Sequence, residues 1–432
     1  MQIKRDFYLG KLVERMHDGY VKVVTGIRRC GKSYLLNTLF REHLLSQGVR
    51  PSSIIQIALD DVAQVALRNP FQLSKHIRKQ IKSEQTQYYV LIDEIQMCEE
   101  VPSEVEGVKS KVSFYDVLNG LIRMPNVDVY VTGSNSKMLS NDIATHFRDR
   151  SKVIRLHPLS FAEYFPVSGL SEYQAFNEYQ VYGGLPECVL SSTALAKREY
   201  LDGLFNTLYL RDIVERNALK NELLLGRLVD FLMSAVGSLT NIRKIVDTLH
   251  SEQKVLCNAH TVQAYLTYLQ QAYLVERADR YDVRGRQYFS YPSKYYAEDI
   301  GLRNARLNYR QTERTHLMEN IIYNELRSRG AGVDVGVVPI KQCRDGEKTQ
   351  GLHEIDFVVN LGMEKLYIQS AYNIDDPGKR EAELLPLRKT GDSFRKLVVT
   401  GGDQPFYTDE SGISFVGILP FLLDRSILER MM

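Results

Sequence analysis

Residues Val21–Ser33 read VKVVTGIRRCGKS, and this stretch decides the fold of the first third of the chain. A run of β-branched residues leads into a glycine, four further residues and Gly-Lys-Ser, the pattern of a phosphate-binding loop. The glycines allow successive backbone N–H groups to turn toward an anion, which a Cβ would obstruct. The helix that follows adds the partial positive charge of its N-terminus. The stretch therefore predicts a strand, a triphosphate-binding loop and a helix.

Each residue of this loop has an expected place around the nucleotide. Lys32 would reach the β- and γ-phosphates of ATP, and the Ser33 hydroxyl would complete the shell of a Mg²⁺ ion. An ordinary strand-to-helix turn is the alternative for this segment alone. The residues that we expect to line the nucleotide are Gly26, Ile27, Arg28, Arg29, Cys30, Gly31, Lys32, Ser33 and Tyr34.

A second apolar run, YYVLIDEI at Tyr88–Ile95, ends in two acids. Such a run is typical of a buried parallel strand that delivers carboxylates at its C-terminal end. Asp93 would bind Mg²⁺ through water, and Glu94 would polarise the water that attacks the γ-phosphate. The alternative is a pair of solvated acids at a strand end. Together with the loop, the pair predicts a Mg²⁺-dependent ATPase.

A third strand, VDVYVT at Val127–Thr132, runs into the residues GSNS. Asn135 and Ser134 are candidates to orient the attacking water, whereas a turn that caps the next helix is the alternative. Arg148, Arg150 and Arg155 follow as candidate arginine fingers. Arg150 is the first choice, acting on the nucleotide of a neighbouring subunit in a homo-oligomer. The alternative for Arg150 is an ion pair with an acid of its own sheet.

Five segments carry a resemblance to a known family: GIRRCGKS, LIDEIQ, VYVTGSNSKML, the FRDR–RLHPLSF stretch and YGGLPE. Together they resemble the prokaryotic AAA-type ATPases that carry an uncharacterised C-terminal domain. The chain is also similar to archaeal ATPases with a winged helix and a restriction-endonuclease-like tail. The resemblance runs from about Ile3 to the C-terminus. It implies an AAA-type P-loop domain with a doubly wound parallel sheet, followed by a helical lid, a winged helix and an α/β nuclease-like domain.

Composition fits a large globular protein without a membrane partner. The 432 residues are 44% hydrophobic, and the net charge of +2 gives no global field that would recruit nucleic acid. Five scattered cysteines without a CxxC pair argue against a disulfide framework or a zinc site. The longest late apolar run, from Ile413 to Leu423, contains Gly417 and Pro420 and is too short to span a bilayer. We therefore expect a cytoplasmic protein.

Changes of pattern along the chain divide it into four predicted parts. Strands and helices alternate over residues 1–160, the ATP-binding domain. Residues 161–220 are helical, as a lid would be. Residues 221–294 read as a winged helix, and residues 295–432 form the tail.

The winged helix leaves DNA binding open. Its third helix offers Asn258, His260 and Gln263 to a major groove but no lysine or arginine, and its wing carries Arg284 and Arg286. The alternative is a winged helix that serves only as a packing module.

The tail has the element order of a PD-(D/E)xK nuclease, with a degenerate active site. Such enzymes hold Mg²⁺ with a helix acid, a strand Asp and an (E/Q)xK motif. Glu319, Asp356 and Gln369 occupy these positions, but Ala371 stands where the lysine belongs. Lys365 or Lys341 could substitute from a neighbouring strand, and we do not expect nuclease activity. Two outputs stay open: ATP-driven work on DNA, or a protein-interaction platform that ATP switches.

Overall fold

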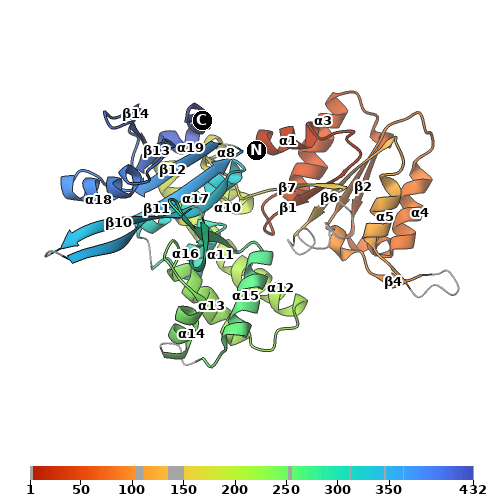
Figure 1. The fold of residues 1–432 in the computed structure, drawn as a ribbon. Coiled ribbons are helices and arrows are strands. Elements are labelled where there is room, and N and C mark those ends of the chain that lie inside the picture. The colour runs from red at the N-terminus through yellow and green to blue at the C-terminus, as the bar shows by residue number, and fades with distance from the viewer. Residues whose placement is uncertain are drawn as a thin grey trace. The chain divides into compact units, whose positions relative to one another are not determined.

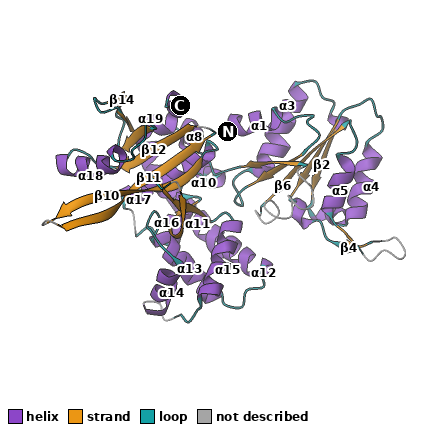
Figure 2. Ribbon diagram, viewed as in Figure 1, coloured by secondary structure: helices purple, strands orange, loops and turns teal. Residues whose placement is uncertain are grey.

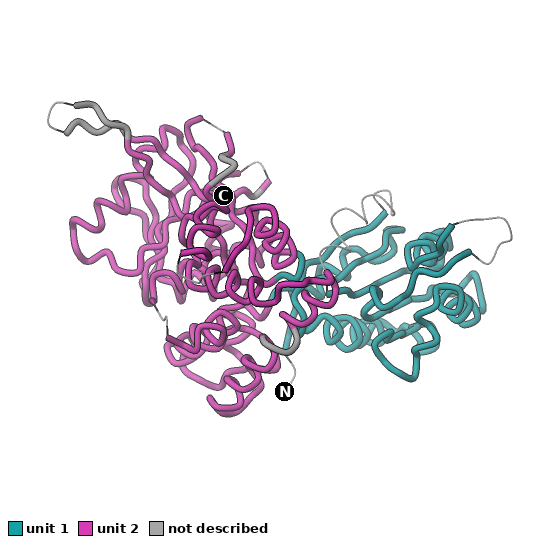
Figure 3. The backbone as a smooth tube through the Cα atoms, turned by 90° about the horizontal axis from the view of Figure 1, so that it is seen from below, with its two compact units in different colours: residues 1–157, 271–273 teal, residues 158–270, 274–432 magenta. Residues whose placement is uncertain are grey.

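The computed structural model describes residues 3–103, 110–134, 150–251, 255–285, 287–310, 313–344, 347–362 and 364–431. The chain forms two compact units (Figure 3). The first contains residues 1–157 and 271–273, and the second contains residues 158–270 and 274–432.

The first unit is built on a five-stranded sheet in which every neighbouring pair is parallel. In spatial order the strands are β2 (Ile54–Ala58), β3 (Tyr88–Asp93), β6 (Val127–Gly133), β1 (Val21–Thr25) and β7 (Ser151–Arg155). The strand β6 therefore lies between the strand that precedes the phosphate loop and the strand that carries the two acids. Since all strands run in one direction, their C-terminal ends meet at one edge, where ligands bind in open α/β sheets.

Helices cover both faces of this sheet, which confirms the doubly wound class (Figures 1 and 2). Leu73, Ile77 and Leu118 pack against one face in a core with the alternate strand residues. On the other face the ring of Phe40 lies 4.5 Å from that of Tyr130. The helical elements are α1 (Asp6–Val13), α2 (Lys32–Tyr34), the π-helical stretch η1 (Leu35–Phe40), α3 (Arg41–Ser46), α4 (Pro70–Gln80) and α5 (Phe114–Leu121).

A small ribbon and a 3₁₀ turn follow the acidic strand before α5 begins. The turn is η4 (Ile95–Met97), and the ribbon pairs β4 (Val101–Pro102) with β5 (Lys111–Val112). The sequence pattern did not predict the ribbon, because two-residue strands carry no detectable alternation.

The second unit begins with helices. They are α8 (Phe161–Ser168), α9 (Glu172–Tyr182), α10 (Pro186–Leu190), α11 (Ala194–Gly203), η5 (Leu204–Tyr209), α12 (Leu210–Arg216), α13 (Glu222–Ser234), α14 (Ile242–Ser251) and α15 (Ala259–Gln271). Further along the chain come α16 (Ile300–Arg306), α17 (Arg314–Ser328), α18 (Pro377–Arg388), α19 (Ile418–Leu423) and α20 (Ser426–Arg430).

An eight-stranded mixed sheet organises the rest of this unit. Its spatial order is β14 (Tyr407–Thr408), β15 (Ile413–Gly417), β13 (Arg395–Thr400), β12 (Glu364–Ala371), β11 (Glu347–Leu361), β10 (Gly332–Arg344), β8 (Val275–Asp282) and β9 (Gln287–Ala297). The predicted hairpin of β11 and β12 is confirmed, with Leu361 paired to Glu364.

The predicted boundary at residue 294 falls inside β9. The hairpin β8–β9, which was assigned to the winged helix, joins the sheet of the tail through parallel pairing of β8 with β10. Backbone hydrogen bonding therefore makes the wing and the tail one continuous sheet.

Candidate functional site

The phosphate loop joins β1 to α2 at the C-terminal edge of the sheet, and two of its glycines are required by the backbone. Gly26 has φ +148°, and a Cβ there would lie 2.0 Å from the carbonyl oxygen of Leu156. Gly31, the N-cap of α2, has φ +97° in the left-handed region. The loop therefore turns tightly, with no room for a side chain at Gly26 and a glycine-favouring backbone at Gly31.

Lys32 is buried within the loop that it follows. Its Nζ donates to the carbonyl oxygens of Gly26 at 3.1 Å and Ile27 at 3.0 Å. Ser33 beside it is exposed, so its hydroxyl is accessible to a ligand. Cys30 is fully buried and its Sγ donates to the Leu156 carbonyl at 3.5 Å, which assigns it a packing role.

The two acids are held by a single hydroxyl from the neighbouring strand. Thr132 Oγ1 donates to Asp93 Oδ1 and accepts the backbone N–H of Glu94 at 2.9 Å. Asn37, in the helix after the phosphate loop, donates to Asp93 Oδ2 at 3.3 Å. The structure thus connects the loop helix, the acidic strand and β6 through side-chain hydrogen bonds.

Glu94 adopts a backbone conformation that is uncommon outside glycine. Its φ and ψ are both +50°, in the left-handed region. Such strain tends to occur at functional sites, where the surrounding structure enforces it. The side-chain amide of Gln96 donates to the Glu94 carboxylate, and Ser134 Oγ donates to the same oxygen, Oε2, at 3.4 Å.

Three of these contacts come from residues that the sequence did not single out: Asn37, Gln96 and Thr132. Gln96 stood within the LIDEIQ segment and Thr132 at the end of a predicted strand. Their hydrogen-bond partners depend on the strand order, which local sequence does not encode.

The candidate sensor and finger residues are only partly placed. Asn135 and Arg148 lie outside the described residues. Arg150 is exposed, and its carbonyl accepts the N–H of Val21 at the start of β1. Arg150 therefore lies at the edge of the sheet opposite the phosphate loop, separated from it by the five residues of β7 at about 3.3 Å each. Arg155 lies at the loop edge instead, in register with Thr25.

The helices and hairpin expected for a winged helix are present as α13, α14, α15 and β8–β9. The wing residue Arg284 is already engaged within the unit: its guanidinium donates to the carbonyl oxygens of Lys389 at 2.7 Å and Pro339 at 3.1 Å. Arg286 lies outside the described residues. Arg284 therefore supports packing of the wing on the tail.

The predicted acids of the tail converge, but with a cation that the sequence analysis did not name. Lys294 Nζ on β9 donates to Glu319 Oε1 at 2.9 Å, to Asp356 Oδ1 at 3.4 Å and to Glu354. We refer to these four side chains as the Lys294 cluster. Asp356 also accepts the N–H of Ser370 at 2.9 Å, and its own N–H donates to Gln369.

Lys365, a predicted replacement for the nuclease lysine, does not contact the acids of the Lys294 cluster among the described hydrogen bonds and ion pairs. Its Nζ donates to Tyr281 Oη at 3.3 Å. Local sequence does not indicate the role of Lys294, because the residue lies at the end of the predicted winged helix, 25 positions before Glu319. An ammonium has three N–H donors, and three carboxylates accept from Lys294. Burial lowers the pKa of Lys294, but the carboxylates of Glu319, Asp356 and Glu354 outweigh that effect and raise it.

The YGGLPE segment serves packing inside the second unit. The N–H of Gly184 donates to Asp299 Oδ2 at 2.8 Å, and a Cβ on Gly183 would lie 2.3 Å from Asp299 Oδ1. Burial raises the pKa of Asp299 to about 6, although the N–H of Gly184 acts to lower it. These glycines allow the turn after α9 to contact the carboxylate that caps α16.

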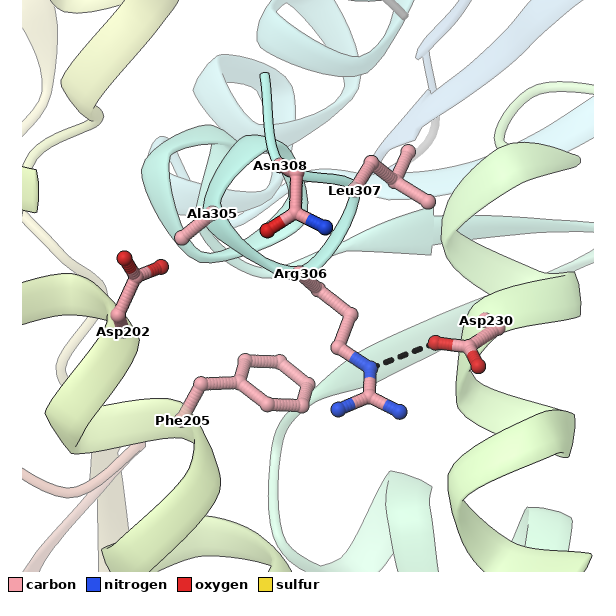
Figure 4. A pocket seen from close by; sticks show the side chains of 7 residues that line it. All are labelled: Asp202, Phe205, Asp230, Ala305, Arg306, Leu307 and Asn308. Atoms are coloured by element: carbon pink, nitrogen blue, oxygen red, sulfur yellow. Dashed lines mark hydrogen bonds and ion pairs between the residues drawn. The ribbon is translucent and has the colours of Figure 1, made fainter. Parts of the chain in front are cut away.

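A pocket of about 540 Å³ opens between helices of the second unit (Figure 4). Arg306 Nε donates to Asp230 Oδ1 at 2.6 Å, and the guanidinium lies 5.5 Å from the ring centroid of Phe205. The pocket contains none of the predicted site residues. Its lining consists of Asp202, Phe205, Asp230, Ala305, Arg306, Leu307 and Asn308.

Among the described residues, no helix is both long enough and apolar enough to cross a membrane.

Two family models match separate parts of the chain. Residues 18–165 match the model of an AAA domain, and residues 173–313 match a domain of unknown function. An uncharacterized protein of Haemophilus influenzae is 32% identical over 428 residues, covering 98% of each chain. An uncharacterized protein of Methanocaldococcus jannaschii is 25% identical over 424 residues, covering 93% of this chain and 87% of the relative.

Solved structures give a weaker likeness. The Aeropyrum pernix ORC1 protein in complex with DNA is 14% identical with a TM-score of 0.26, covering 71% of this chain and 93% of that one. Cdc6p from Pyrobaculum aerophilum is 11% identical with a TM-score of 0.29, covering 74% and 95%. Scores this low carry no argument about function or domain arrangement.

Proposed function

The chain belongs to the family of AAA-type P-loop ATPases represented by its Haemophilus influenzae relative, and from this premise we propose that it binds Mg²⁺-ATP and hydrolyses it. The observation that carries the proposal is the placement of β6 between β1 and β3. This order brings the phosphate loop, Asp93 and Glu94 to one edge of the sheet.

Each residue has a separate task in this proposal. The loop N–H groups and Lys32 bind the phosphates, which requires the Lys32 ammonium to exchange the carbonyls of Gly26 and Ile27 for phosphate oxygens. Ser33 and Asp93 are oxygen donors of the type that Mg²⁺ prefers, and the bound ion would neutralise developing charge on the phosphates. Glu94 accepts a proton from the attacking water. Ser134, which directly follows β6, is the described polar candidate to orient the water, and Asn135 is the candidate next to it in the sequence.

We further propose a homo-oligomer in which Arg150 acts on the neighbouring subunit's nucleotide. The support is its position: it is exposed, at the sheet edge away from its own phosphate loop, and has no ion pair among the described residues. An arginine supplied in trans stabilises the charge of the phosphoryl transition state.

For the second unit we propose a recognition module under control of the ATP state, without nuclease activity. Arg284 donates to backbone carbonyls and Lys294 to three carboxylates, so neither cation is arranged to receive a phosphodiester. These contacts favour a protein partner over DNA. The free cysteines, among them buried Cys30 and Cys188, fit a reducing compartment such as the cytoplasm.

The experiment for the ATPase is phosphate release from ATP by the full-length chain, with Mg²⁺ or with EDTA. We expect release that requires both Mg²⁺ and Lys32, and equal rates in wild type and Lys32→Ala would contradict the assignment. DNA binding is tested separately by titrating duplex DNA at several salt concentrations. A steep loss of affinity with salt would mark phosphate contacts and favour the DNA alternative.

A further inference from the structure

Gln96 lies in η4, the turn that immediately follows Glu94. Its Nε2 donates to Glu94 Oε2 and, at 3.2 Å, to Ser134 Oγ. Ser134 Oγ in turn donates to Glu94 Oε2. Three side chains from two adjacent segments of the sheet edge therefore form a closed hydrogen-bonded ring around one carboxylate oxygen.

The ring fixes the orientation of the Gln96 amide. Only the NH₂ end of an amide can donate, so it must face the carboxylate and the carbonyl end must point away. The Oε1 atom at that end is shielded from solvent and has no hydrogen-bond partner among the described residues. A buried acceptor without a donor is unfavourable. The Glu94 carboxylate therefore sets this orientation of the amide, although the orientation leaves Oε1 without a donor.

We infer that Gln96 is a positioning residue for Glu94: its amide holds the carboxylate oxygen Oε2 in the orientation from which Glu94 accepts a proton from the attacking water. The inference rests on the proposed ATPase function and extends it to a residue that the sequence did not single out. In the reaction the water oxygen bonds to the γ-phosphorus, the bond to the ADP oxygen breaks, and one water proton passes to Glu94. Gln96 exchanges no proton, because its amide only orients the base.

Two substitutions of similar size remove the donor. Gln96→Met replaces the amide with an apolar group, and Gln96→Glu replaces the NH₂ with an oxygen that repels Glu94. Both should lower kcat about 100-fold, the effect of misplacing a reacting group by about 1 Å, while KM and the affinity for Mg²⁺-ATP stay unchanged. Gln72→Met, at an exposed position of α4, is the matched control and should leave kcat and KM as in wild type.

A double-mutant cycle separates positioning from a general structural effect. If Gln96 acts through Glu94, adding Gln96→Met to Glu94→Gln should slow single-turnover hydrolysis no further. If Gln96→Met slowed hydrolysis equally in the wild-type and Glu94→Gln backgrounds, the inference about Gln96 would be wrong. Wild-type kcat in both Gln96→Met and Gln96→Glu would also overturn it. Either result would leave the proposed ATPase function standing. No hydrolysis by the wild-type chain would overturn the proposed function as well.

Discussion

At the scale of single residues, the phosphate loop is fixed by conformations that only glycine adopts without strain. Gly26 and Gly31 have positive φ, and Gly26 lies against the carbonyl of Leu156. Their positions follow from the sequence pattern alone, since the pattern encodes a local backbone path.

The substitution Gly26→Ala tests this requirement. The new Cβ would meet Leu156 O at 2.0 Å at a φ of +148°, so we expect a loss of more than about 1 kcal/mol in unfolding free energy and loss of ATP binding. Gly10→Ala is the control, because no atom lies within 4 Å and the position is inside α1. It should stabilise the protein by roughly 0.5–1 kcal/mol. Equal melting temperatures for the two variants would contradict the account.

The hydrogen-bond partners of Asp93 and Glu94, unlike the glycines of the loop, do not follow from the sequence pattern. Asp93 and Glu94 could be predicted from an apolar run that ends in two acids, but Thr132 and Asn37 could not. Thr132 reaches Asp93 only because β6 pairs with β3, and Asn37 because the loop helix lies over the same edge. Strand pairing is a long-range property that a local pattern does not contain.

At the scale of elements, the helices and strands of both units lie close to their predicted positions, whereas the predicted boundary between wing and tail falls inside β9. Hydrophobic periodicity reports which residues form β8 and β9, but not which sheet they join. The pairing of β8 with β10 also explains how Lys294 reaches the acids of the tail.

Replacing the cation of the Lys294 cluster should destabilise the second unit. Lys294→Met leaves Glu319, Glu354 and Asp356 without their shared partner, a loss of about 3–5 kcal/mol in unfolding free energy. Lys379→Met, at an exposed site of α18, should change it little. Denaturant titration of both variants measures the difference, and comparable midpoints would indicate that the cluster is not a structural ion network.

The same cluster predicts the absence of nuclease activity. Because all three N–H donors of Lys294 are engaged, the full-length protein should not cleave DNA or RNA in Mg²⁺ or Mn²⁺. Asp356→Ala should lower stability and leave ATP hydrolysis unchanged. Cleavage by the wild-type chain that disappears in Asp356→Ala would establish the nuclease alternative.

At the scale of the whole molecule, the proposed arginine in trans would divide the ATPase site between neighbouring copies. Arg150 and Lys32 lie at opposite edges of one sheet, so a shared site requires assembly.

Mixing two inactive variants tests that assembly. Lys32→Ala and Arg150→Ala should each hydrolyse ATP poorly, and an equimolar mixture should regain activity, because one mixed interface contains an intact loop and an intact arginine. No recovery on mixing, together with a rate per molecule that is independent of protein concentration, would contradict the shared site.

The most direct test of the central claim compares Glu94→Gln with Lys32→Ala in equilibrium binding of Mg²⁺-ATP and in single-turnover hydrolysis. We expect Glu94→Gln to bind ATP as wild type does and to hydrolyse it far more slowly, because an amide cannot accept the proton. Lys32→Ala should fail at the binding step, since the phosphates lose the cation of the loop. Hydrolysis by Glu94→Gln at the wild-type rate would contradict the assignment of Glu94 as the base.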